Sequence, residues 1–116
     1  GGMAVSGLTL TLTFPDDLEV TDKIEIIAPL GYELADSQNL VGEEHCNNLQ
    51  WLPMASSPIT SSSLTTCRGN RMTVTIQEST AITNGTTIKV RLNTRNPEIS
   101  RPWWDRYWHA RHVTSA

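Results

Sequence analysis

The chain of 116 residues lacks any apolar run long enough to cross a membrane. A membrane-spanning helix needs about 18 consecutive apolar residues, and no window of the sequence approaches that length. The sequence also lacks the charged and then apolar pattern of a secretory leader. Because Gly1-Gly2-Met3 is typical of a remnant ahead of a native segment, the missing leader says little about export. We expect a soluble piece, with no membrane insertion by this segment.

Metal-binding motifs are missing as well. Cys46 and Cys67 are the only two cysteines, and a pair without C-x-x-C spacing makes half of a metal site at best. His109 and His112 form an H-x-x-H pair. On a strand, positions i and i+3 point to opposite faces, so joint chelation would require a helix or a bend. We therefore expect no metal site and no cofactor.

Catalytic constellations are equally weak. No serine lies in a nucleophile elbow, and His45 and Cys46 form the only adjacent histidine–cysteine pair. Asp16-Asp17 follows an expected strand, where aspartates are typical of a solvated turn. Glu43-Glu44 precedes His45 without the spacing of a calcium loop. We expect no catalytic residue and a chain that is not an enzyme; the alternative is an enzyme or a metal carrier centred on the histidines.

The two cysteines have polar neighbours, among them His45 and Arg68, which is unusual for buried free thiols. A bridge that closes the 20 intervening residues would stabilise the fold by about 3 kcal/mol in the chain-entropy model. We predict a disulfide between Cys46 and Cys67, with two free thiols as the alternative. Such a bridge would place the chain outside the cell or at its surface.

Basic residues are scarce in the first half of the chain. Residues 1–66 hold nine acids against Lys23 alone, whereas residues 67–116 hold eight bases against three acids, so the halves carry −8 and +5. Either the halves interleave and neutralise each other, or opposite ends carry opposite charge and help copies or modules dock head to tail. The acidic first half and a pI near 5.5 argue against nucleic acid as a partner.

Alternating apolar and polar residues are the strongest positive signal in the sequence. From Ser6 to Phe14 the alternation is nearly unbroken, and it returns over Met72–Ile76 and Thr87–Asn93. Side chains of a strand alternate between two faces, so each segment offers one apolar face to a shared core. Further extended segments are expected over residues 22–28, 32–34 and 46–52. In the last of these, Trp51 is expected to pack inward near the disulfide.

Turn signals separate these segments. Pro15-Asp16-Asp17 ends the first strand, and the Ser/Thr-rich residues 56–66 are expected to form a loop, with O-glycosylation as an alternative role. Asn84-Gly85 is typical of a hairpin turn. Asn84-Gly85-Thr86 also matches the N-x-[ST] acceptor, which makes Asn84 a candidate glycosylation site.

The spacing of strands and turns predicts an all-β fold. We expect a two-sheet antiparallel β-sandwich of immunoglobulin-like, Greek-key type with about seven strands. The length allows one domain only. Residues 6–113 should form this domain, after a remnant or flexible lead at 1–5 and before a flexible tail at 114–116.

Four of the seven aromatic residues lie in one segment, Arg101–His112. Alternate residues would face opposite sides of a strand, and both sets cannot be buried with so many charges between them. Some aromatic surface should therefore be exposed. The candidate ligand or partner contacts are Trp103, Trp104, Arg106, Tyr107, Trp108 and His109. These residues would seal the sandwich or pack on a neighbouring module; a sugar-binding platform is the next interpretation, and stacking on nucleic-acid bases is the last.

Several short motifs occur in a definite order along the chain. They are the alternating first strand, Ala28-Pro29-Leu30-Gly31-Tyr32, the two spaced cysteines, the hairpin sequence of residues 83–92, Asn96-Pro97 and the tryptophans of Trp103–Trp108. In this order they resemble a module repeated in very large cell-surface or secreted proteins of dinoflagellates and related protists. The resemblance implies an extracellular β-sandwich unit in a tandem array, with Asn96-Pro97 and the tryptophans at a module end. The dense aromatic run departs from that pattern and leaves open a role special to this copy, such as assembly or ligand contact.

We therefore expect a non-enzymatic extracellular structural or adhesion module, one unit of a larger multi-domain or polymeric surface protein. Its expected partners are neighbouring modules or other protein subunits. The alternative is a carbohydrate-binding module that contacts glycans through the C-terminal Trp/Tyr cluster.

Overall fold

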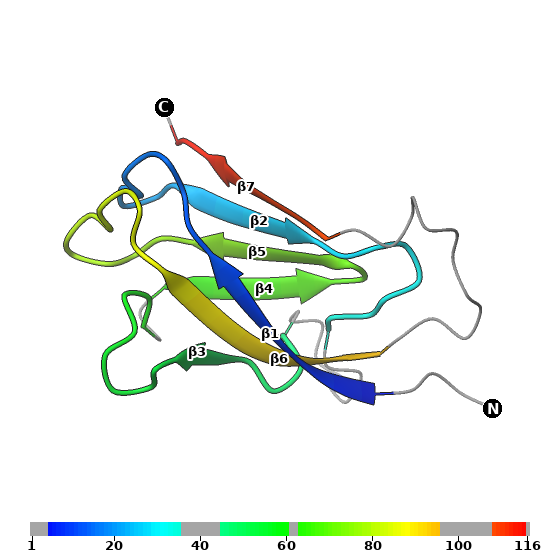
Figure 1. Cartoon of the computed structure of the whole chain (residues 1–116). Coiled ribbons are helices and arrows are strands. Elements are labelled where there is room, and N and C mark those ends of the chain that lie inside the picture. Colours follow the sequence, from blue (N-terminus) through cyan, green and yellow to red (C-terminus); the bar gives the residue numbers. More distant parts are fainter. Residues whose placement is uncertain (1–4, 36–44, 61–62, 96–107, 116) are drawn as a thin grey trace.

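Seven strands in two antiparallel sheets make up the computed structural model, which describes residues 5–35, 45–60, 63–95 and 108–115 (Figure 1). The strands are β1 (Val5–Leu12), β2 (Lys23–Ile27), β3 (Gln50–Leu52), β4 (Leu64–Arg68), β5 (Arg71–Thr75), β6 (Ile88–Arg95) and β7 (His109–Val113). This described part of the chain has no helix, and so none with the length and apolar character of a membrane span. The predicted all-β sandwich of about seven strands is confirmed.

The first and last strands lie in unexpected places. One sheet has the order β1-β6-β3 and the other has the order β4-β5-β2-β7. Strands β2 to β6 follow the order of strands B to F in immunoglobulin domains, whose sheets are ABED and CFG. Here β7 lies beside β2, in the place of strand A, and β1 lies beside β6, in the place of strand G. The central Greek key is thus immunoglobulin-like, while the two terminal strands have exchanged sheets.

The core lies between the inner faces of the two sheets. Strands β2 and β6 alternate between buried and more exposed residues, as a half-buried strand should. Ile24 and Ile26 of β2 and Val90 and Leu92 of β6 are at most 1% exposed. Trp51 of β3 is partly buried against this core, as the sequence predicts. The outward residues of the same strands carry the charges and hydroxyl groups discussed below.

The Ser/Thr-rich segment 56–66 is only partly the loop that the sequence predicts. Its last residues, from Leu64 to Thr66, open β4. Leu64 is 61% exposed, so the segment lacks the apolar alternation by which a half-buried strand is recognised. The strand forms because a turn at Gly69, which has a φ of 57°, folds it back onto β5 over its whole length.

The Asn84-Gly85 turn forms, but the predicted hairpin does not. The Thr86 N–H donates to the Thr83 carbonyl at 3.1 Å, and Gly85 has a φ of 75°. The residues on either side pair with other parts of the chain: Ile82 bridges to Leu18, and β6 pairs with β1. The turn predicted at Asn84-Gly85 is therefore confirmed, whereas the predicted pairing of the two segments that flank it is wrong.

Candidate functional site

Cys46 and Cys67 form the predicted disulfide, with a Cα–Cα distance of 4.9 Å. Cys67 lies on β4 and is 1% exposed. Cys46 precedes β3 and pairs with Ala35 in an isolated antiparallel bridge. The bond therefore joins the segment before β3 to the edge of the other sheet. Because both sulfurs are used in this bond, neither serves as a nucleophile or a metal ligand.

A buried acid–base pair joins the entry of β2 to β7. His112 Nε2 lies 2.7 Å from Asp22 Oδ2, and the two side chains are 9% and 5% exposed. Asp22 also accepts hydrogen bonds from the backbone N–H of Glu19 at 3.0 Å and of Ser115 at 3.1 Å. The ring of Phe14 meets the imidazole edge-on, with the ring centroids 6.2 Å apart. Three donors thus surround one carboxylate beneath the last strand.

Two opposing effects act on the pKa of Asp22. Burial raises this pKa, because a carboxylate loses solvation inside the protein. The hydrogen bonds from Glu19, His112 and Ser115, with the positive charge of His112, outweigh burial and leave the pKa below its ordinary value. Asp22 is therefore an ionised acceptor that holds β7 against β2. This arrangement is a structural clamp, with both carboxylate oxygens occupied.

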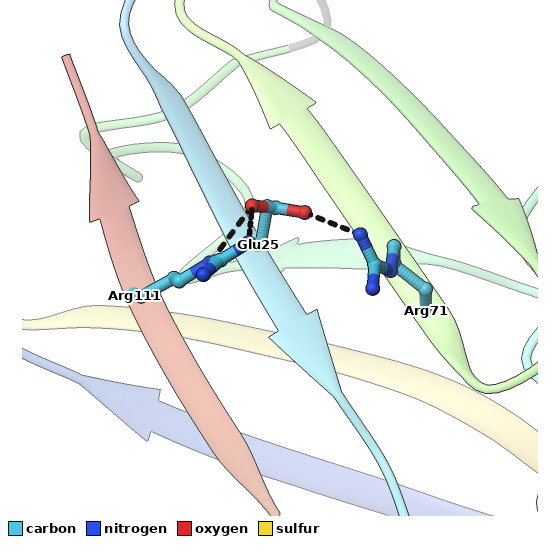
Figure 2. A network of polar contacts seen from close by, with 3 residues as sticks. All are labelled: Glu25, Arg71 and Arg111. Carbon is cyan, nitrogen blue, oxygen red and sulfur yellow. Dashed lines mark hydrogen bonds and ion pairs between the residues drawn. The ribbon is translucent and has the colours of Figure 1, made fainter.

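Glu25 of β2 lies between two arginines on the outer face of the four-stranded sheet (Figure 2). Arg71 of β5 donates through Nη1 to Oε2 at 2.8 Å, and Arg111 of β7 donates through Nε to Oε1 at 2.9 Å. A second Arg111 nitrogen, Nη2, lies 2.7 Å from Oε1. The glutamate side chain is only 13% exposed, whereas the arginines are 51% and 63% exposed. One carboxylate therefore links three neighbouring strands.

These pairs decide how the two halves of the chain share their charges. The acids come from the first half of the sequence, at Asp22 and Glu25, and their partners come from the second half, at Arg71, Arg111 and His112. Acids of the first half and bases of the second half therefore lie side by side both at Asp22 and at Glu25, as one of the two interpretations of the sequence predicts. Neutralisation is local, because strands from the two halves lie side by side in one sheet.

Two regions keep an excess of one charge. Asp16, Asp17 and Glu19 are exposed in the segment 13–22, which contains no lysine or arginine. Lys89 and Arg91 project from the exposed face of β6, and strands β1, β3 and β6 contain no acidic residue. The three-stranded sheet therefore presents a basic outer face, while the loop that follows β1 is acidic.

Most of the predicted aromatic contact surface lies outside the described residues: Trp103, Trp104, Arg106 and Tyr107. Trp108 immediately precedes β7, is half-buried and packs edge-on against Tyr32, with ring centroids 5.6 Å apart. His109 opens β7 and is exposed. His112, three residues on, points inward to Asp22. The two histidines thus lie on opposite faces, as the sequence predicts for a strand.

Asn84 is exposed and bound to Asp17 in the loop between β1 and β2. Its backbone N–H donates to Asp17 Oδ1 at 2.7 Å, and its side-chain amide donates to the same oxygen at 2.9 Å. The Gly85 N–H donates to the Phe14 carbonyl at 2.9 Å. These bonds fix the turn that presents the candidate glycosylation acceptor.

An open, mainly apolar hollow lies beside β3. Trp51, Met54 and Ile59 line it, together with Ser57 and Thr60. Met54 is 76% exposed. At the rim of the hollow the backbone N–H of Thr60 donates to the carboxylate of Glu78 at 2.8 Å, and Ser63 Oγ donates to the same carboxylate at 3.0 Å.

Comparisons with protein-family models, with curated proteins and with solved structures found no match. Within the described residues, no group of three or more His, Cys, Asp or Glu side chains is placed to hold a metal ion. Among the described residues, the most buried ion pairs are the Asp22–His112 pair and the Glu25 network.

Asp22 is the residue that sequence reasoning missed. The sequence places it at the start of the expected extended segment 22–28, without a role as a buried acid. Its position carried a signal, since it lies two residues before Ile24 and four before Ile26, and so shares the inward face of that strand. An acid on an inward position needs a buried partner, and His112 provides it.

Proposed function

We propose that this chain is a non-enzymatic structural or adhesion module of an extracellular or cell-surface protein, one unit of a larger multi-domain or polymeric assembly. The observation that carries the proposal is the closed Cys46–Cys67 bridge in a small β-sandwich. Disulfides persist in oxidising compartments and are common in small secreted domains. The resemblance to tandem modules of protist surface proteins supports the same interpretation.

The buried and half-buried polar groups support a mechanical role. Asp22 and His112 hold β7 to the start of β2, and Glu25 ties β2 to β5 and β7. These contacts fasten the last strand at two points along its length. A module in a chain under tension benefits from such fastening, because load enters through the terminal strands.

The proposed contact surface is the aromatic segment that leads into β7, with Trp103, Trp104, Arg106, Tyr107, Trp108 and His109. Trp108 anchors the end of this segment against Tyr32, and His109 is exposed at the first position of β7. A neighbouring module or another protein subunit would pack on the aromatic side chains, since indole rings bury a large area with little loss of entropy.

Intact mass of the protein from its native source, without reduction and with thiol alkylation, tests the proposal. A closed bridge, with added sugar mass that disappears in the Thr86→Ala variant, would place the module outside the cell. Two alkylatable thiols and no sugar would contradict the proposal. Binding to a glycan array that is lost on Trp108→Ala, with folding intact, would instead favour the carbohydrate-binding alternative.

A further inference from the structure

The four edge strands of the two sheets differ in how they are protected. Strand β3 has three residues and is followed at once by Pro53, β4 ends on Arg68, and β7 carries His109, Arg111 and His112. Short length, proline and charge are means by which natural edge strands avoid further pairing. Strand β1 uses none of them, because its eight residues, VSGLTLTL, include neither a charge nor a proline.

The side of β1 that faces away from β6 is long and regular. All eight residues pair in continuous antiparallel register with β6, from Val5 opposite Arg95 to Leu12 opposite Ile88. In the described part of the chain, β6 is the only strand that pairs with β1 (Figure 1). The backbone groups on the other side of β1 are therefore a template for one more strand.

We propose that β1 pairs with β1 of a second copy of this chain, antiparallel and about a two-fold axis. The two three-stranded sheets would then form one continuous six-stranded sheet. This inference goes beyond the proposed function, because it concerns a surface separate from the aromatic segment. It also holds whatever the compartment of the protein, so the two proposals can fail independently.

Strand β1 is complementary to itself. In an antiparallel pair centred on Thr9, Leu8 of one copy lies opposite Leu10 of the other, and Thr9 lies opposite Thr9. Residues of equal parity meet in this register, so Leu8 meets Leu10 and Leu12 meets Ser6 on the core side, while Thr9 meets Thr9 and Thr11 meets Gly7 on the solvent side. Leu8, Leu10 and Leu12 are only half-buried in the single copy, and each gains a cross-strand neighbour in the pair. Such a contact is isologous and closes as a dimer.

Charge does not oppose a second copy as the occupant. No charged side chain lies on either β1, so no like charges meet at the seam. The nearest cations on the same face, Lys89 and Arg91, belong to β6. The two β6 strands would be three strand spacings apart, about 14 Å, which exceeds the screening length of about 8 Å at physiological salt. The basic outer faces therefore do not prevent the pairing.

The double variant Thr9→Glu/Thr11→Glu separates folding from pairing. In the single copy, Thr9 lies directly opposite Arg91 and Thr11 directly opposite Lys89, so the new glutamates meet cations and the fold is retained. In the dimer, the two glutamates at position 9 lie directly opposite each other, and each glutamate at position 11 is diagonal to the position-9 glutamate of the other copy. We expect sedimentation velocity to show concentration-dependent dimers for the natural chain and at least about tenfold weaker association for the variant.

Thr75→Glu is the matched control, because Thr75 lies opposite Lys23 on β5, which belongs to the other sheet. It should leave the dimer unchanged. A chain that remains monomeric at about 1 mM, the concentration at which even a weak contact of about 4 kcal/mol is half formed, would overturn the proposal. Association that persists in the Thr9→Glu/Thr11→Glu variant, or that Thr75→Glu weakens equally, would also overturn it.

A cysteine trap tests the register. In the proposed pair, Thr9 faces its own copy across the two-fold axis, where opposite Cβ atoms are about 5 Å apart. Thr9→Cys should therefore give a covalent dimer under mild oxidation, and Thr75→Cys should not. Equal crosslinking of both variants would argue for random collision. Hydrogen exchange supplies a second readout, since amides of β1 should gain protection as the concentration of the natural chain rises.

Discussion

The imidazole of His112 lies 2.7 Å from the carboxylate of Asp22, although 90 positions separate the two residues in the sequence. This contact joins the last strand of the sandwich to the start of its second strand. It also explains why a histidine occupies the inner face of an edge strand, because a buried carboxylate requires hydrogen-bond donors.

The stability of the fold should depend on the charge of Asp22. Because its folded-state pKa is lowered, the unfolded chain takes up this proton at a higher pH than the folded chain. The contribution of Asp22 is therefore complete above its unfolded pKa of about 4 and is lost as the pH falls through the lower folded-state value. Asp22→Asn should lower the free energy of unfolding by about 1–3 kcal/mol at neutral pH. It should also flatten the acid dependence.

Urea unfolding at a series of pH values measures this difference. Asp16→Asn is the control, because Asp16 is exposed on the neighbouring turn and should leave the acid dependence intact. An Asp22→Asn variant that loses stability with acid as steeply as the natural chain would show that other carboxylates govern the transition.

Removal of the disulfide should destabilise the module. The double variant Cys46→Ala/Cys67→Ala opens a loop with a sequence separation of 21 and should lower the free energy of unfolding by about 3 kcal/mol. Chemical denaturation under non-reducing conditions measures the change. Reduction of the natural chain should produce a similar loss while leaving the double variant unaffected. If reduction has no effect on the natural chain, the bridge is not a source of stability.

Neutralising Glu25 should remove the ion pairs that connect β2 to β5 and β7. In Glu25→Gln, Arg71 and Arg111 lose their shared carboxylate and face each other across β2. The arginines are largely exposed, so we expect a loss of about 1 kcal/mol that shrinks at high salt. Lys23→Gln on the same outer face of β2 is the control and should cost little. Thermal denaturation of both variants and the natural chain at two salt concentrations measures this loss of stability. A loss that does not change with salt would contradict an electrostatic origin.

Two glycines should respond in opposite ways to alanine. A Cβ on Gly85 would meet no atom within 4 Å, yet its φ of 75° is strained for an L-residue, so Gly85→Ala should cost about 1 kcal/mol. Gly7 lacks such a φ, and a Cβ there would meet the flexible Arg91 guanidinium at 3.4 Å. Gly7→Ala should be neutral or slightly stabilising. Equal losses in urea unfolding would show that space, rather than backbone conformation, controls both sites.

Much of the fold could be predicted from local pattern. Alternation placed Ile24 and Ile26, like Val90 and Leu92, on inward faces, and all four are buried. The pattern failed where a strand had no apolar face, as at Leu64 in β4. It failed again at Asn84-Gly85, where a correct turn suggested a pairing that the tertiary structure does not contain. A turn restricts two or three residues, whereas pairing is decided by which strands bury the most surface together.

By itself, the sequence of this protein predicted which side chains of the alternating strands face inward, because side-chain alternation is local. It also limited any disulfide within the chain to Cys46 and Cys67, because two cysteines allow one pairing. Only the tertiary structure decided that β7 lies beside β2 and β1 beside β6. Those neighbours gave Asp22 its histidine and Glu25 its arginines, and among the described residues they left one edge of β1 without a partner strand. Strand neighbours and these ion pairs depend on contacts between segments that are distant in the sequence. Such contacts produce no periodic pattern of residues, so local sequence analysis does not detect them.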